Sequence, residues 1–148
     1  MNSRAVAAIA LLTVVAGGAP TAASGQSGEA VYRARLSVVP IDLAMARTIA
    51  GSGSATATLK GRTLTVSGTF EGLKSPATVL RLHRGPNRGL RGPAIGDLTA
   101  TPATAGEMGG SIELTAAQVE DLRRGRLYLQ LHSEGAPDGN LWGWLLVK

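Results

Sequence analysis

The chain has 148 residues, and its 15 Lys and Arg side chains against 10 Asp and Glu give a formal net charge of +5. It contains no cysteine, which excludes disulfide bonds, thiolate metal sites and cysteine nucleophiles. The mild positive charge favours weak attraction to acidic surfaces but does not identify one.

Residues 1–24 are typical of a secretory signal peptide. Arg4 supplies a positive start, residues 5–16 form an apolar run, and residues 20–24 are small enough for cleavage. The run is too short to span a bilayer, although a non-cleaved signal anchor is an alternative. We therefore expect a secreted or periplasmic protein that is not transmembrane after cleavage. Its mature chain of roughly 125 residues would form one domain over residues 30–148.

Apolar and polar residues alternate with a period of two through most of the mature chain, which is typical of β-strands. At the start, Tyr32 and Leu36 point to one face, whereas Arg33 and Arg35 point to the other. Gly61 suits the turn of a hairpin between two such segments. We expect strands at residues 32–38, 53–59, 63–70, 77–83, 94–98, 110–114, 126–132 and 141–147. A helical turn is expected within residues 43–49.

One short helix interrupts the strands. Thr115 and Gln118 form a capping box, in which the Thr115 hydroxyl accepts a hydrogen bond and Gln118 reaches back. Val119 and Leu122 supply an apolar stripe, and Gly125 is the expected left-handed stop. After the strand that ends at His132, a tight hairpin with Gly139 in its turn is expected to lead into the last strand.

This order of elements predicts an all-β fold, an antiparallel β-sandwich with one short helix. The core between its sheets is expected to contain Leu36, Val38, Leu64, Val66, Leu80, Leu82, Leu129, Leu131, Leu145 and Val147.

The mature chain resembles the chordin-type (CHRD) domain, in its bacterial single-domain exported form. The matching segments are residues 80–85, 114–118, 128–132 and 137–143, and the similarity spans residues 31–148. The resemblance implies a Greek-key β-sandwich of superoxide-dismutase-like or immunoglobulin-like architecture. In animals such domains occur in an extracellular antagonist of growth factors. The bacterial members offer no established activity to transfer.

Two histidines mark the first candidate site. The family carries a His-x-His segment, but Arg81 replaces its first histidine here, and His83 and His132 are the only histidines in the chain. Strand alternation places Arg81 and His83 on one face, and Tyr128, Gln130 and His132 on one face of their own strand. We expect these five residues to form a ligand pocket, in which Arg81 favours an anion. The alternative is a copper or zinc site at His83 and His132, which would need further ligands.

A second candidate site is the Gly- and Pro-rich loop that follows His83. Arg84, Arg88 and Arg91 project from a segment without acidic residues and suit an anion-binding loop. The plainer interpretation is a solvated loop. Trp142 and Trp144 share one face of the last strand, where sheet packing is favoured over a ligand platform.

No enzyme motif is present, and no catalytic residue is predicted. No aromatic residue interleaves with the loop arginines, so specific nucleic-acid binding is not expected. We expect an exported, non-enzymatic binding or structural module without a cofactor. Its expected partner is an anionic envelope surface or another extracytoplasmic protein. The alternative is a metal-binding sandwich protein of superoxide-dismutase-like ancestry that holds copper or zinc.

Overall fold

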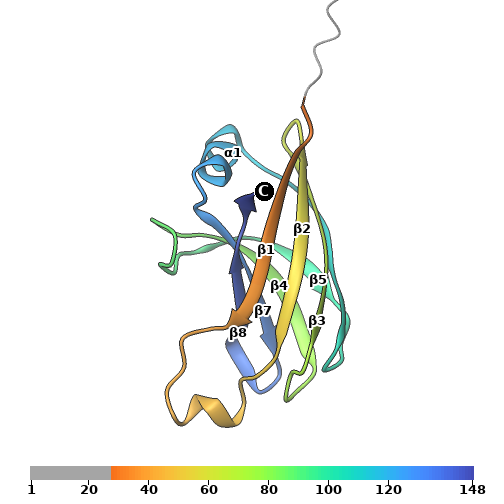
Figure 1. Ribbon diagram of the computed structural model, residues 1–148, viewed down its shortest axis with the longest axis vertical. Helices are drawn as coiled ribbons and strands as arrows, with labels where there is room; N and C mark the ends of the chain where they lie inside the picture. The colour runs from red at the N-terminus through yellow and green to blue at the C-terminus, as the bar shows by residue number, and fades with distance from the viewer. Residues whose placement is uncertain (1–27) are drawn as a thin grey trace, which may run out of the picture.

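The computed structural model describes residues 28–148, so the predicted signal peptide over residues 1–24 lies outside the described part. The described chain forms an antiparallel β-structure with one α-helix (Figure 1). Its elements are β1 (Ala30–Val38), the 3-10 helix η1 (Met45–Arg47), β2 (Ser52–Lys60), β3 (Thr63–Glu71), β4 (Ala77–Arg84), β5 (Ala94–Ala100), β6 (Gly106–Glu113), α1 (Ala116–Arg123), β7 (Leu127–Ser133), β8 (Ala136–Trp144) and β9 (Leu146–Val147). Within residues 28–148, no helix is long and apolar enough to cross a membrane.

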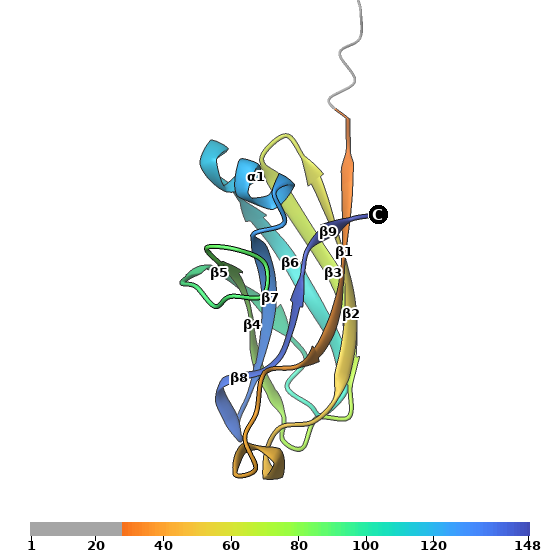
Figure 2. The same cartoon turned by 60° about the vertical axis from the view of Figure 1, so that its left-hand side comes forward.

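The all-β class with one short helix is confirmed, but the sandwich needs correction. The strands follow the order β2-β3-β6-β5-β4-β7-β8-β1, and β1 pairs again with β2, so the sheet closes into an eight-stranded antiparallel barrel. Strand β1 makes the closure, because residues 30–36 pair with β2 while Ser37 and Val38 pair with β8. Strand β5 likewise pairs with both β4 and β6. Figure 2 shows β4 and β7 on one side of the barrel and β1 and β2 on the other.

The interior of the barrel holds the apolar residues of the alternating pattern. Leu64, Leu80 and Leu82 are fully buried, as are leucines of β7 and β8. Two residues that were expected in the core are not fully buried: Val38 is half-buried, and Val147 is 67% exposed. Val147 is exposed because β8 ends at Trp144 and the short β9 pairs only with β1 at the rim.

Helix α1 begins and ends as the sequence predicts. The Thr115 hydroxyl accepts from the Gln118 N–H at 3.2 Å, and the Gln118 side-chain oxygen accepts from the Thr115 N–H at 2.9 Å. Gly125 adopts a φ of 68°, the left-handed conformation of a helix stop. Val119 and Leu122 bury the apolar side of the helix at one end of the barrel (Figure 1).

The hairpin between β7 and β8 turns earlier than expected. Its turn lies at Glu134 and Gly135, so Gly139 lies inside β8. Gly139 has a φ of 128°, and an added Cβ would lie 2.7 Å from the Gln130 amide nitrogen. The glycine is therefore needed for close packing against Gln130 rather than for the turn.

Candidate binding site

Strands β4 and β7 present the residues of the predicted pocket on the outer face of the barrel. Arg81 lies opposite Gln130 in the strand register, and His83 lies opposite Tyr128. The ring centroids of His83 and His132 are 6.2 Å apart, and the Tyr128 ring stacks on His83 at 4.9 Å. The structure thus brings the two histidines together, with Arg81 beside them on the same face.

Backbone carbonyls orient both imidazole rings. His83 Nδ1 lies 2.9 Å from the Gly92 carbonyl oxygen, and His132 Nδ1 lies 2.8 Å from that of Pro137. A carbonyl oxygen can only accept, so each Nδ1 carries a proton and donates it. In a neutral ring the lone pair is therefore on Nε2. This is the tautomer that metal-binding histidines adopt when a second partner holds Nδ1.

Gln130 contacts His132 and adds an unsatisfied acceptor. Its Nε2 donates to the Asp138 carbonyl at 3.1 Å and lies 3.3 Å from His132 Nε2, so Oε1 must point away from both. Gln130 Oε1 and His83 Nε2 are buried, and neither has a hydrogen-bond partner within residues 28–148. A buried acceptor without a donor costs about 1–3 kcal/mol. Each of these acceptors would be stabilised by a hydrogen-bond donor or a cation.

Burial keeps both imidazoles neutral. Desolvation lowers the pKa of His83, the Gly92 carbonyl partly opposes this, and the positive charge of Arg81 lowers the pKa further. Desolvation lowers the pKa of His132 in the same way, with Pro137 opposing and Arg81 reinforcing. At neutral pH the lone pair of His83 Nε2 is therefore unprotonated and without a partner among residues 28–148, whereas that of His132 Nε2 accepts from the Gln130 amide.

The charge of Arg81 is partly compensated. Its Nε donates to Asp97 Oδ1 of β5 at 2.9 Å, in a pair that is largely exposed to solvent. Asp97 therefore weakens the repulsion that Arg81 would exert on a cation in the pocket. In the part of the chain that the structure describes, no group of three His, Cys, Asp or Glu side chains could hold a metal ion. A metal here would need Gln130 or external ligands.

The structure separates the three arginines of the predicted anion-binding loop. Arg84 pairs with Asp121, a buried carboxylate of α1. The guanidinium of Arg91 lies 5.8 Å from the centre of the Trp142 ring. Only Arg88 lines a groove. The loop also covers the histidine pocket, because Gly92 accepts from His83 and exchanges hydrogen bonds with the Tyr128 hydroxyl.

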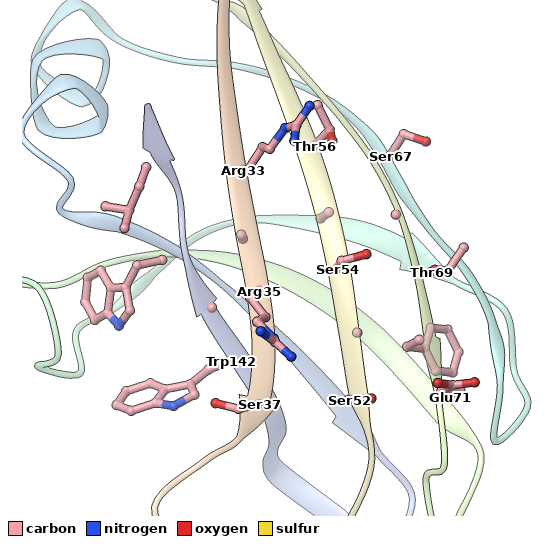
Figure 3. A pocket seen from close by; sticks show the side chains of 18 of the residues that line it. Arg33, Arg35, Ser37, Ser52, Ser54, Thr56, Ser67, Thr69, Glu71 and Trp142 are labelled. Carbon is pink, nitrogen blue, oxygen red and sulfur yellow. The ribbon is translucent and has the colours of Figure 1, made fainter. Parts of the chain in front are cut away.

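A groove of about 1160 Å³ lies on the outer face of β1, β2 and β3, with β8 at its edge (Figure 3). Arg33 and Arg35 of β1 lie on one side of this groove, and Glu71 of β3 lies on the other. Its floor carries six hydroxyl side chains: Ser37, Ser52, Ser54, Thr56, Ser67 and Thr69. None of these groove residues was predicted as a site residue. The outward positions of the first three strands contained the signal, because arginine and hydroxyl residues alternate there with buried apolar ones.

The two tryptophans share one face, as expected, but this face is the outside of the barrel. Both are half-buried and line the groove. Trp144 packs against Tyr128 at 4.6 Å between ring centroids, and Trp142 contacts the edge of the same ring at 5.8 Å. An added Cβ at Gly143 would lie 2.6 Å from the Arg35 carbonyl oxygen. Strand β8 thus approaches β1 closely, and the register places Trp142 opposite Ser37 at the edge of the groove.

Comparison with known proteins identifies the family of this chain. Searches of curated proteins and of solved structures find no match. The family model described as the CHRD domain matches residues 32–145, which include most of β1 and all of β2 to β8. The chain therefore belongs to the CHRD domain family.

Proposed function

We propose that this CHRD domain is an exported, non-enzymatic binding module, and that it captures an anionic component of the cell envelope in the groove over β1, β2 and β3. One observation carries the proposal: three arginines line the groove and a single glutamate opposes them. Within residues 28–148, neither Arg33 nor Arg35 nor Arg88 takes part in an ion pair, whereas six other ion pairs form. Their guanidinium groups therefore remain free to bind an anion.

The location of these charges supports the groove over the loop as the binding surface. Arg84 is already paired with a buried carboxylate, and Arg91 lies over an aromatic ring. Arg33 and Arg35 are two residues apart on one strand, so they point in the same direction. The register places Arg33 opposite Thr56 and Arg35 opposite Ser54, and in Figure 3 the Arg33 side chain extends over β2 toward Thr56. A strand holds this arrangement more rigidly than the loop could.

The test compares retention on anionic liposomes and on an anionic polysaccharide matrix across a salt series. The variant carries Arg33→Ser and Arg35→Ser. Its control carries Arg47→Ser and Lys60→Ser, which remove the same charge outside the groove. Salt weakens such binding, because exposed charges are screened beyond about 8 Å at physiological ionic strength. We expect the groove variant to elute at lower salt than the control on at least one matrix, because it lacks the two charges that would contact the anion. Equal elution of the two variants on both matrices would exclude the groove as the anion site.

A second candidate function is binding of a copper or zinc ion at the histidine pocket. It is favoured by the lone pair of His83 Nε2, which is buried without a partner among residues 28–148. Carbonyl oxygens hold both rings in the required tautomer, and His132 Nε2 would become the other nitrogen ligand by exchanging the hydrogen bond from the Gln130 amide for the ion. A bound ion would give this buried acceptor the partner that it lacks.

The metal content of the purified protein and calorimetric titration with Zn²⁺ or Cu²⁺ test this candidate. We expect one ion per chain in the native protein and none when His83 and His132 are both changed to Asn. Asn retains a donor for the backbone carbonyl, so the fold should persist in this variant. Failure of the native protein to bind either ion more tightly than the variant would reject the metal site.

A further inference from the structure

We propose that the groove binds a segment of an acidic polysaccharide, with Trp142 packed against a sugar ring and the arginines on its acidic groups. This inference rests on the proposed capture of an anion in the groove and names the class of ligand. It follows from three features that occur together on this face: free guanidinium groups, an array of hydroxyl groups and a half-exposed indole ring.

The hydroxyl array sets this groove apart from a simple basic patch. Six Ser and Thr side chains line it, and all six are exposed. The register places Thr56 opposite Ser67, and Ser54 opposite Thr69, so the hydroxyl groups form rows across β2 and β3. Each hydroxyl can donate and accept, which matches the hydroxyl groups of a sugar. A carbohydrate chain would therefore find polar partners along the whole floor.

The indole rings complete the arrangement. Trp142 is half-buried: edge contacts with Tyr128 and Trp144 at 5.8 Å and 6.1 Å fix its ring, and the Arg91 guanidinium lies over the ring, 5.8 Å from its centre. A ring held in this way can present one apolar surface at low entropic cost. The two indoles are inclined at 63°, so they do not form a row of parallel platforms for successive nucleic-acid bases.

The composition of the groove also favours a polysaccharide over a lipid surface. A membrane-docking face needs apolar side chains that enter the bilayer. The exposed large apolar residues in the described chain are Val31, Ile41, Leu43, Leu90 and Val147, and none of them lines the groove. The groove instead combines separated positive charges with neutral hydroxyl groups, which suits a polymer that alternates acidic and neutral polar groups.

The test uses calorimetric titration of the purified protein with alginate oligosaccharides. Thr56→Val removes a groove hydroxyl without changing the shape of the side chain, and Thr58→Val makes the same change on the same strand outside the groove. We expect Thr56→Val to weaken alginate binding roughly two- to tenfold, the effect of one lost hydrogen bond, and Thr58→Val to leave it unchanged. Trp142→Ala should weaken binding at least as much, whereas Trp142→Phe should restore part of it.

Two further probes separate the possible ligands. Phosphatidylglycerol vesicles and single-stranded oligothymidylate are titrated in the same buffer, with Arg33→Ser/Arg35→Ser and the charge-matched Arg47→Ser/Lys60→Ser. One outcome would overturn the polysaccharide but leave anion capture intact. In it, the native protein binds alginate no better than the vesicles or the oligonucleotide, and Arg33→Ser/Arg35→Ser loses binding to one of these two probes. Equal binding of every probe by both double variants would overturn the proposed function itself. Preferential binding of alginate, weakened by Arg33→Ser/Arg35→Ser and by Thr56→Val, supports the inference.

Discussion

Acidification is expected to destabilise this protein through His83 and His132. Burial lowers the pKa of both rings in the folded protein, whereas a histidine in the unfolded chain titrates near 6.5. Below that pH the unfolded state binds more protons than the folded state, so stability decreases as pH falls. The decrease begins near pH 6.5 and continues through the lowered pKa values. Above about pH 7.5 both states are neutral at these positions, and the effect disappears.

The expected size follows from the number of protons involved. A ring that stays neutral in the folded protein lowers the free energy of unfolding by about 1.4 kcal/mol between pH 7.5 and 5.5. Two such rings lower it by at most about 2.7 kcal/mol. The positive charge of Arg81 favours the neutral rings and pushes the loss toward this limit, while Asp97 opposes it. Small domains have a total stability of about 5–15 kcal/mol, so the change is readily measured.

Urea unfolding followed by tryptophan fluorescence measures this loss, because both indoles pack against Tyr128 in the folded state. The control is His83→Asn combined with His132→Asn, which shares every carboxylate with the native protein. Only the difference between their pH slopes is attributed to the histidines. If both proteins lose the same free energy of unfolding from pH 7.5 to 5.5, the histidines are not held neutral and the reasoning is refuted.

Three substitutions test other parts of the structure by the same unfolding measurement. Arg84→Ala should reduce stability by about 1.5 kcal/mol, because it removes charged hydrogen bonds from the buried Asp121; native stability would mean that this pair contributes nothing. Gly143→Ala should cost about 1–3 kcal/mol, since the added methyl would lie 2.6 Å from the Arg35 carbonyl oxygen; an unchanged free energy of unfolding would contradict this close approach. Thr115→Ala should cost about 1 kcal/mol through the lost helix cap, and a neutral result would show that the cap is dispensable.

The strands and the helix could be predicted from the sequence because their signals are local. Alternation assigns the inward and outward residues of each strand, and the capping box locates the start of α1 to the residue. Closure of the barrel could not be predicted in this way. A sandwich and a barrel share the same alternation, and they differ in whether β1 pairs with both β2 and β8. That pairing joins segments far apart in sequence and leaves no local pattern.

For the candidate sites too, the sequence predicted the local arrangement of side chains but not the contacts between strands. Alternation placed Arg81 with His83, and Gln130 with His132, on common faces. It could not give the 6.2 Å separation of the two imidazoles, because the register between β4 and β7 shifts between Ala77 and Leu80. The groove was missed for a related reason. The outward arginines of β1 become a site only when the hydroxyl residues of β2 and β3 lie beside them.

The two candidate sites share the loop between β4 and β5. We therefore predict that ligand binding in the groove stabilises the loop over the histidines, and that Arg88 transmits this effect. Arg88 lines the groove, while Gly92 of the same loop contacts His83 and donates its N–H to the Tyr128 hydroxyl at 3.1 Å. A ligand that binds Arg88 restrains this loop and should therefore slow hydrogen exchange of the Gly92 amide. Exchange measured by NMR with saturating alginate should be slower in the native protein. In Arg88→Ser the ligand should still bind through Arg33, but the protection of Gly92 should largely disappear. Equal protection in both proteins would show that the loop is already rigid and that the two sites act independently.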